Sequence, residues 1–199
     1  MSEKILDENY WDKRYHEHSA TWDIGKISTP LKEYIDQLKD KTISILIPGC
    51  GNAYEAEYLL ENGFTNIIVI DISPTLVQSI QAKLKAYEGK QLHIICDDFF
   101  NLKQHFDLII EQTFFCALDP HLRKKYAVKM YELLKPGGKL IGVLFNRVFE
   151  GGPPFGGSKE EYEKLFAGDF EITKMEECYN SIAPRSGSEL FIILRKATL

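Results

Sequence analysis

Long hydrophobic runs are absent from this sequence of 199 residues, and no segment approaches the roughly 18 uninterrupted apolar residues of a membrane-spanning helix. The start of the chain, Met1 to Lys4, lacks the apolar region of a secretory signal peptide. Basic residues are outnumbered, with 24 Lys and Arg against 29 Asp and Glu, which argues against a broad phosphate-binding surface. We therefore expect a cytoplasmic protein that contacts neither membranes nor nucleic acid.

Cysteine is scarce, and no pair has the C-x-x-C spacing of a structural zinc site. The five histidines also lack metal-binding spacing, and we interpret them as surface residues. No Ser-His-Asp or Cys-His arrangement is present, so the sequence assigns no residue a catalytic role. We expect neither a metal site nor a disulfide. The four dispersed cysteines are Cys50, Cys96, Cys116 and Cys178.

What the chain does contain is an alternation of strand-like and helix-like segments, in a length and apolar content (44%) that suit one domain. Apolar and β-branched runs predict strands, and apolar residues at helical spacing predict helices between them. The expected strands are 43–47, 66–70, 92–96, 106–110, 139–145, 170–178 and 189–195. The expected helices are 53–62, 74–87, 120–134 and 159–166, the last beginning with a Ser158–Glu161 capping box.

This order predicts an α/β fold, a doubly wound, mostly parallel sheet of seven strands. The last two strands have no helix between them and should form a C-terminal antiparallel hairpin. We divide the single expected domain 1–199 into an N-terminal segment 1–29, a βα core 41–145, and a region 146–199 containing a ligand-side loop, a helix and the hairpin.

A glycine turn follows the first expected strand. Gly49 and Gly51 let the backbone turn where a Cβ would collide with a ligand, and Asp71 ends the next strand 20 positions beyond Gly51. A strand, a glycine turn, a helix and a distant acid predict binding of a nucleoside-bearing cofactor. The alternative is an ordinary tight turn with a solvated aspartate. Asp98 and Glu111 end the third and fourth strands, so all these residues should meet at one edge of the sheet.

Several motifs together resemble the thiopurine methyltransferase superfamily of S-adenosylmethionine-dependent methyltransferases, and most closely its halide and thiol methyltransferase branch. They are the N-terminal segments 10–15 and 21–25, the turn 47–51, and the segments 114–120, 133–138 and 151–154. The resemblance covers nearly the whole chain. It implies a Rossmann-like methyltransferase fold whose N-terminal helix forms a lid over S-adenosylmethionine.

Site residues follow from that resemblance. The residues that would bind the cofactor are Trp11, Tyr15, Trp22, Gly49, Gly51, Asp71, Ile72, Asp98, Phe99, Glu111 and Gln112. Those that would bind the acceptor are Glu111, Phe115, Arg147 and Phe155, with Phe114 and Arg185 beside them. The halide and thiol branch commonly has tryptophan in place of Tyr15 and tyrosine in place of Phe155. Phe155 would therefore favour a larger, more apolar thiol over a halide.

Other interpretations stay open at this stage. Trp11 and Tyr15 could form part of a core stripe, Asp98 could cap a turn, and Glu111 could be a solvated strand end. For the whole chain, we weigh methyl transfer to a small molecule, most consistent with a thiol and alternatively a halide or thiopurine, against two rivals. These are a nicotinamide-dependent oxidoreductase and a non-catalytic S-adenosylmethionine-binding protein. The sequence leaves the oligomeric state open and is compatible with a monomer.

Overall fold

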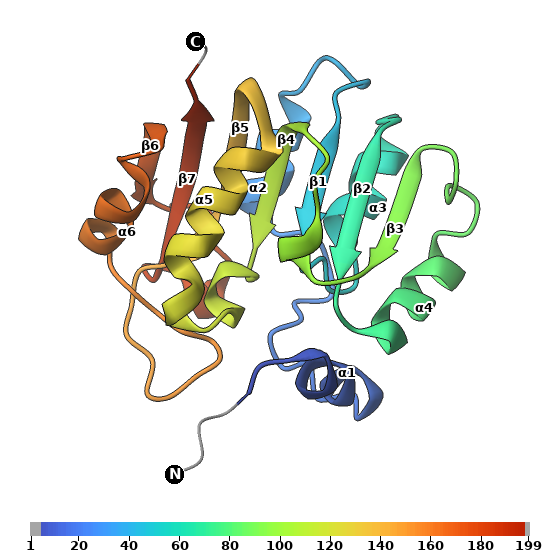
Figure 1. The fold of residues 1–199 in the computed structure, drawn as a ribbon, viewed down its shortest axis with the longest axis horizontal. Coiled ribbons are helices and arrows are strands. Elements are labelled where there is room, and N and C mark those ends of the chain that lie inside the picture. Colours follow the sequence, from blue (N-terminus) through green and yellow to red (C-terminus); the bar gives the residue numbers. More distant parts are fainter. Residues whose placement is uncertain (1–4, 198–199) are drawn as a thin grey trace.

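Seven strands form one sheet in the computed structural model, which describes residues 5–197 (Figure 1). Their spatial order is β3-β2-β1-β4-β5-β7-β6, and β7 runs antiparallel to both of its neighbours while the other pairs are parallel. The order reverses between β1 and β4, so the crevice beyond their carboxyl ends is the expected ligand position. The strands are β1 (Ile45–Pro48), β2 (Ile67–Asp71), β3 (Leu92–Cys96), β4 (Phe106–Gln112), β5 (Leu134–Phe145), β6 (Phe170–Glu177) and β7 (Glu189–Lys196).

Helices cover both faces of the sheet and divide its apolar residues between two cores. One core joins β4, β5 and β7 to α5 and α6 through residues such as Tyr126 and Phe166. The other joins β1, β2 and β4 to α2, α3 and α4 through residues such as Leu31, Leu59 and Ile80. The helices are α1 (Glu8–His16), α2 (Thr29–Asp36), α3 (Tyr54–Glu61), α4 (Pro74–Lys83), α5 (Arg123–Leu133) and α6 (Lys159–Phe166).

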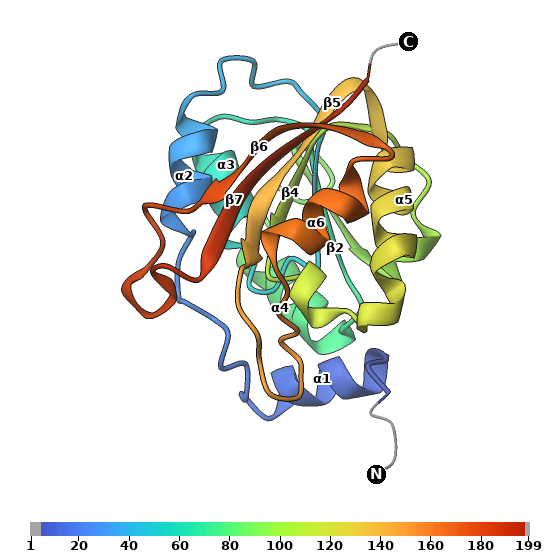
Figure 2. The ribbon, with the colours of Figure 1, turned by 90° about the vertical axis from the view of Figure 1, so that its left-hand side faces the viewer.

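The expected architecture is confirmed: the sheet is doubly wound and mostly parallel, with antiparallel strands at the C-terminal end. Helix α1 lies across the carboxyl ends of the strands, outside both layers (Figures 1 and 2). Helix α2 was not expected. It begins at Thr29 with Pro30 in its first turn, and Leu31 and Ile35 bury its inner face. No helix within residues 5–197 has the length and apolar content to cross a membrane.

The segment 135–138 has a different secondary structure from the one predicted. Its Pro-Gly-Gly sequence was expected to separate a helix from a strand beginning at Lys139, yet β5 begins directly after α5, at Leu134. Leu134 pairs with Phe106 and Lys139 with Leu108, so the four residues between them form a bulge within the ladder. A Cβ on Gly138 would lie 3.0 Å from the Phe106 carbonyl oxygen. The glycine thus permits close strand approach.

Candidate functional site

A cavity of about 750 Å³ lies at the carboxyl ends of the parallel strands, within the size range of small-molecule sites. Its floor comes from the turns after β1, β2, β3 and β4. Its cover comes from α1 with the loop behind it, and from loops after β5 and before β7. Figures 1 and 2 both place α1 and the loop 146–157 on this side of the sheet. Segments far apart in sequence therefore enclose one space.

The glycine turn after β1 forms part of the floor. Gly49 and Gly51 have φ of +54° and +51°, a region that strains residues with a Cβ. A Cβ on Gly49 would lie 2.7 Å from Cγ of Phe114, so this turn and the segment after β4 pack directly together. Gly49 lines the main cavity, whereas Gly51 lines a smaller adjoining one of about 50 Å³.

Asp71 ends β2 and places its carboxylate in the cavity wall. Oδ1 accepts a hydrogen bond from the backbone N–H of Ser73 at 3.1 Å, and Oδ2 accepts one from Gly51 at 3.4 Å. The side chain is 8% exposed, and burial raises its pKa to about 6 despite these bonds. Two backbone amides orient the group while lone pairs remain for a ligand. Ile72 lines the cavity beside it.

Asp98 and Phe99 follow β3 and both line the cavity. The Asp98 carboxylate accepts the Phe100 N–H at 2.9 Å, so Asp98 caps a turn as well as lining the cavity. Phe99 is 4% exposed and packs edge-on against Phe114, with 5.2 Å between ring centroids. The third strand end thus supplies an apolar wall beside the acid.

Three aromatic side chains from the N-terminal segment cover this floor. The Trp22 ring contacts Trp11 and Tyr15 edge-on, with centroid separations of 5.6 and 5.9 Å. All three line the cavity, and burial raises the pKa of the Tyr15 phenol. The Arg14 guanidinium lies 5.9 Å from the Trp22 ring. Residues 5–27, α1 and the loop behind it, are called the lid below.

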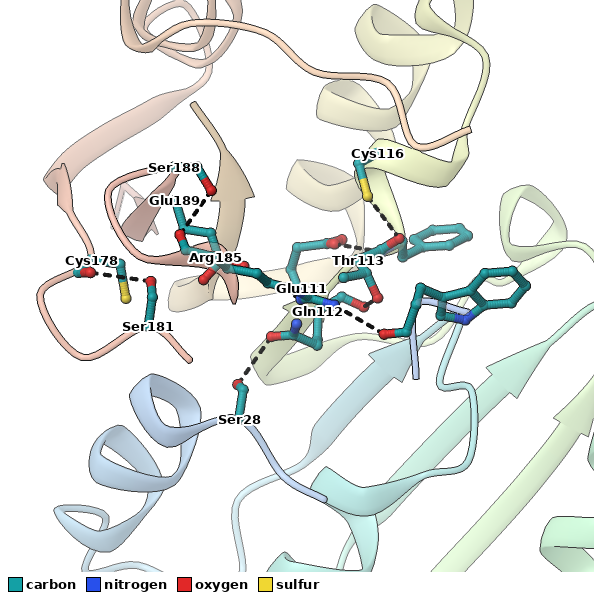
Figure 3. A network of polar contacts seen from close by, with 12 residues as sticks. Ser28, Glu111, Gln112, Thr113, Cys116, Cys178, Ser181, Arg185, Ser188 and Glu189 are labelled. Carbon is teal, nitrogen blue, oxygen red and sulfur yellow. Dashed lines mark hydrogen bonds and ion pairs between the residues drawn. The ribbon is translucent and has the colours of Figure 1, made fainter. Parts of the chain in front are cut away.

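The opposite end of the cavity combines aromatic rings with two arginines. The Arg185 guanidinium donates to the Trp22 carbonyl at 3.0 Å and lies 3.4 Å from the Glu189 carboxylate, at the centre of a polar network (Figure 3). The Arg147 guanidinium lies 4.7 Å above the Phe149 ring. This acceptor end, as we name it, is formed by Phe114, Leu118, Phe145, Arg147, Phe149, Pro153, Pro154 and Arg185.

Comparison with known proteins shows which protein family the chain belongs to. The model of the family described as thiopurine S-methyltransferase matches residues 6–192. The chain belongs to this family. A probable thiol methyltransferase 2 from Arabidopsis thaliana is 32% identical, covering 94% of this chain and 85% of that protein. Thiocyanate methyltransferase 1 from Brassica oleracea is 29% identical, covering 94% and 84%.

Solved structures agree on the fold. The 1,6-didemethyltoxoflavin N1-methyltransferase of Burkholderia thailandensis, solved with S-adenosylhomocysteine, superposes with a TM-score of 0.75. It is 18% identical, and the match covers 96% of this chain and 87% of that one. Family and fold together make this protein an S-adenosylmethionine-dependent methyltransferase acting on a small molecule. The oxidoreductase and the non-catalytic alternatives are set aside.

The residues present fit the cofactor of the thiopurine S-methyltransferase family. The Asp71 carboxylate is an acceptor suited to ribose hydroxyls, and Ile72 and Phe99 offer apolar surface suited to adenine. Trp11, Tyr15 and Trp22 would exclude water above it. When bound, S-adenosylmethionine supplies a methyl group made electrophilic by its sulfonium.

Five expected site residues do not line the main cavity: Gly51, described above, and Glu111, Gln112, Phe115 and Phe155. Glu111 is fully buried: Oε1 accepts the N–H groups of Phe114 and Phe115 at 2.8 and 3.0 Å, and Oε2 accepts the Tyr126 hydroxyl at 2.8 Å. Glu111 therefore holds the loop that carries Phe114 and does not line the main cavity. Gln112 accepts the Ser28 hydroxyl at 3.0 Å and lines the smaller cavity (Figure 3).

Phe115 and Phe155 do not line the main cavity either. Phe115 is 1% exposed and packs edge-on against Tyr126 and Tyr162 in the core. The Phe155 ring folds back over Gly152, where an added Cβ would collide with it. Phe149 lines the acceptor end instead, and sequence reasoning missed it. Its position two residues after Arg147, in a loop on the ligand side, was the available signal.

Cofactor affinity should depend on pH through Asp71. Its raised pKa of about 6 means that the carboxyl is ionised at pH 8 and largely protonated at pH 5. Since the ionised form is the stronger acceptor for ribose hydroxyls, the affinity for S-adenosylhomocysteine should fall as the pH drops through about 6, approaching tenfold per unit below it. Calorimetric titrations from pH 5 to pH 8 measure this. An Asp71→Asn variant should give a flatter profile, and an equally steep one would assign the titration to another group.

Proposed function

We propose that this methyltransferase transfers the methyl group of S-adenosylmethionine to small apolar thiols, which react as thiolates. The observation that carries the proposal is the acceptor end, where the rings of Phe114, Phe145 and Phe149 line the same cavity as the Arg147 guanidinium, which lies over Phe149. Aromatic walls suit an apolar body, and a nearby cation favours the anionic form of a thiol. The thiol and thiocyanate methyltransferases among its relatives support a sulfur nucleophile.

The two arginines at the acceptor end differ in availability. Arg185 is engaged by Glu189 and by the Trp22 carbonyl, so its charge is partly neutralised and it fastens the lid to the loop before β7. Arg147 is exposed, and among residues 5–197 no carboxylate lies within ion-pairing distance of it. Of these two arginines, Arg147 is therefore the one available to an incoming thiolate.

Chemistry at this site requires placement more than acid–base groups. A thiolate is a strong soft nucleophile, and holding it in line with the methyl group can lower the activation barrier by several kcal/mol, up to about 7 to 11 in the best-oriented cases. The aromatic walls can fix the acceptor, and the lid aromatics can keep water out. The chain's own task is thus to orient two molecules in a dry cavity and to favour the thiolate.

Replacing Arg147 with methionine tests this role. The variant should raise the KM for a thiol such as thiophenol by about tenfold, and it should shift the pH profile of kcat towards higher pH, because less of the bound acceptor is ionised. The affinity for S-adenosylhomocysteine should not change. Steady-state methylation assays from pH 6 to pH 9 provide the measurement.

Arg195→Met is the matched control, since Arg195 is a cation on β7 that lies near Glu171 and does not line the cavity. Arg195→Met changes the net charge by the same amount as Arg147→Met. If both variants shift the profile by the same amount, the effect is one of overall charge, and Arg147 has no role at the acceptor.

A further inference from the structure

The lid helix α1 is anchored to α4 by one carboxylate. Asp12 Oδ1 accepts hydrogen bonds from the Ser73 hydroxyl at 2.6 Å and from the Thr75 backbone N–H at 2.8 Å. Its Oδ2 accepts one from the Thr75 hydroxyl at 3.0 Å. The Ser73 bond is the largest cause of a lowered pKa for Asp12, so the carboxyl stays ionised at neutral pH. Three hydrogen bonds thus join a residue of α1 to the first turn of α4.

Ser73, which donates to Asp12, also hydrogen-bonds to Asp71. Ser73 is fully buried, and its backbone N–H donates to Asp71 Oδ1 at 3.1 Å. Its hydroxyl oxygen accepts the Leu76 N–H at 3.2 Å, which caps α4. Asp12 and Asp71 are therefore connected through a single buried serine. Ser73 therefore supports both Asp71, the carboxylate suited to the ribose, and Asp12, the anchor of the lid.

Apolar packing alone does not secure α1. None of its residues is fully buried, in contrast to every other α-helix that the structure describes. The rest of the lid has separate anchors further along: Tyr54 donates to Asp23 at 3.2 Å, and Arg185 donates to the Trp22 carbonyl. Asp12 fastens α1 itself through three hydrogen bonds, beside Trp11 and Arg14, which line the cavity.

We propose that Asp12 is a positioning residue that latches α1 onto α4, so that the cofactor leaves when the latch opens. Asp12 itself does not line the cavity, and its effect passes through α1 to Trp11 and Tyr15. Breaking the latch should raise the dissociation rate of the cofactor more than it changes the rate of methyl transfer at saturation. The proposal concerns cofactor retention and holds for any acceptor.

The experiment compares Asp12→Ala with Asp12→Asn and with Glu17→Ala, an exposed carboxylate at the C-terminal end of the same helix that lies 3.7 Å from the Lys13 ammonium. Stopped-flow fluorescence of the only two tryptophans, Trp11 and Trp22, reports the release of S-adenosylhomocysteine. Asp12→Ala should speed release by about tenfold or more, since three hydrogen bonds are lost. Asp12→Asn should stay close to the parent, because an amide oxygen can accept the Ser73 and Thr75 bonds and its NH2 can donate to the Thr75 hydroxyl.

Trypsin gives an independent readout, since Lys13 and Arg14 lie within α1. With S-adenosylhomocysteine bound, Asp12→Ala should be cleaved there faster than Glu17→Ala, while kcat with saturating substrates changes less than twofold. If Asp12 had only a structural role, Asp12→Ala would lower the melting temperature, and it would not raise the release rate of S-adenosylhomocysteine while leaving kcat nearly unchanged. Release and cleavage rates in Asp12→Ala equal to those in Glu17→Ala would overturn the latch.

Discussion

Asp71→Ala is expected to weaken S-adenosylhomocysteine binding by at least about 30-fold. Each ribose hydroxyl left without an acceptor in a closed site costs about 1 to 3 kcal/mol, and two hydroxyls face this loss. The substitution also frees the N–H groups of Gly51 and Ser73, which the carboxylate now orients. Isothermal titration calorimetry at pH 8 measures the affinity, where the parent carboxylate is ionised.

Asp71→Asn serves as the matched variant, because it keeps the size of the side chain and one acceptor oxygen. It should lose less affinity than Asp71→Ala. Circular dichroism and melting curves establish that both variants are folded. An unchanged affinity in folded Asp71→Ala would remove Asp71 from the cofactor site.

Glu111→Ala should lower the free energy of unfolding by about 3 kcal/mol or more. Three buried or half-buried donors, the N–H groups of Phe114 and Phe115 and the Tyr126 hydroxyl, lose their acceptor, and each unsatisfied buried group costs about 1 to 3 kcal/mol. A cavity is also left in the core. Urea denaturation at pH 7 measures the loss.

The pH dependence separates the charge of Glu111 from its geometry. Burial raises the pKa of this carboxyl to about 7, above its unfolded value of about 4.5. The part of its contribution to stability that depends on protonation is therefore complete below about pH 4.5 and is lost as the pH rises through 7. Glu111→Gln can still accept both N–H groups through one oxygen, so it should be milder than Glu111→Ala and should remove this pH dependence. If the alanine and glutamine variants have the same urea midpoint of unfolding as the parent, the hydrogen bonds of Glu111 do not stabilise the loop after β4.

Local sequence patterns predicted the parts of the fold that local chemistry decides. The turn at Gly49 and Gly51, the strand ending at Asp71 and the capping box at Ser158 are each specified within a few residues, and all appear in the structure. The bulge at 135–138 is specified by pairing with β4 and not by its own sequence. Its Pro-Gly-Gly motif is equally typical of a helix end, so the boundary could not be read locally.

The candidate site divides in the same way. Residues carried by regular strand ends, such as Asp71 and Asp98, line the cavity as expected. Glu111 also ends a strand, yet its side chain turns inward because the loop after β4 offers two N–H groups and α5 offers Tyr126. Phe155 lies in an irregular loop whose path decides which ring faces the cavity. Neither orientation follows from spacing along the chain.

The measurement that tests the account most directly is a competition between a thiol and a halide. Parent protein with S-adenosylmethionine and equal concentrations of thiophenol and iodide should form methyl phenyl sulfide in large excess over methyl iodide, as quantified by gas chromatography with mass detection. The apolar walls of the acceptor end favour the larger nucleophile. Reactions without protein give the background. Faster formation of methyl iodide than of the thioether would contradict the proposed thiol specificity and assign the site to halides.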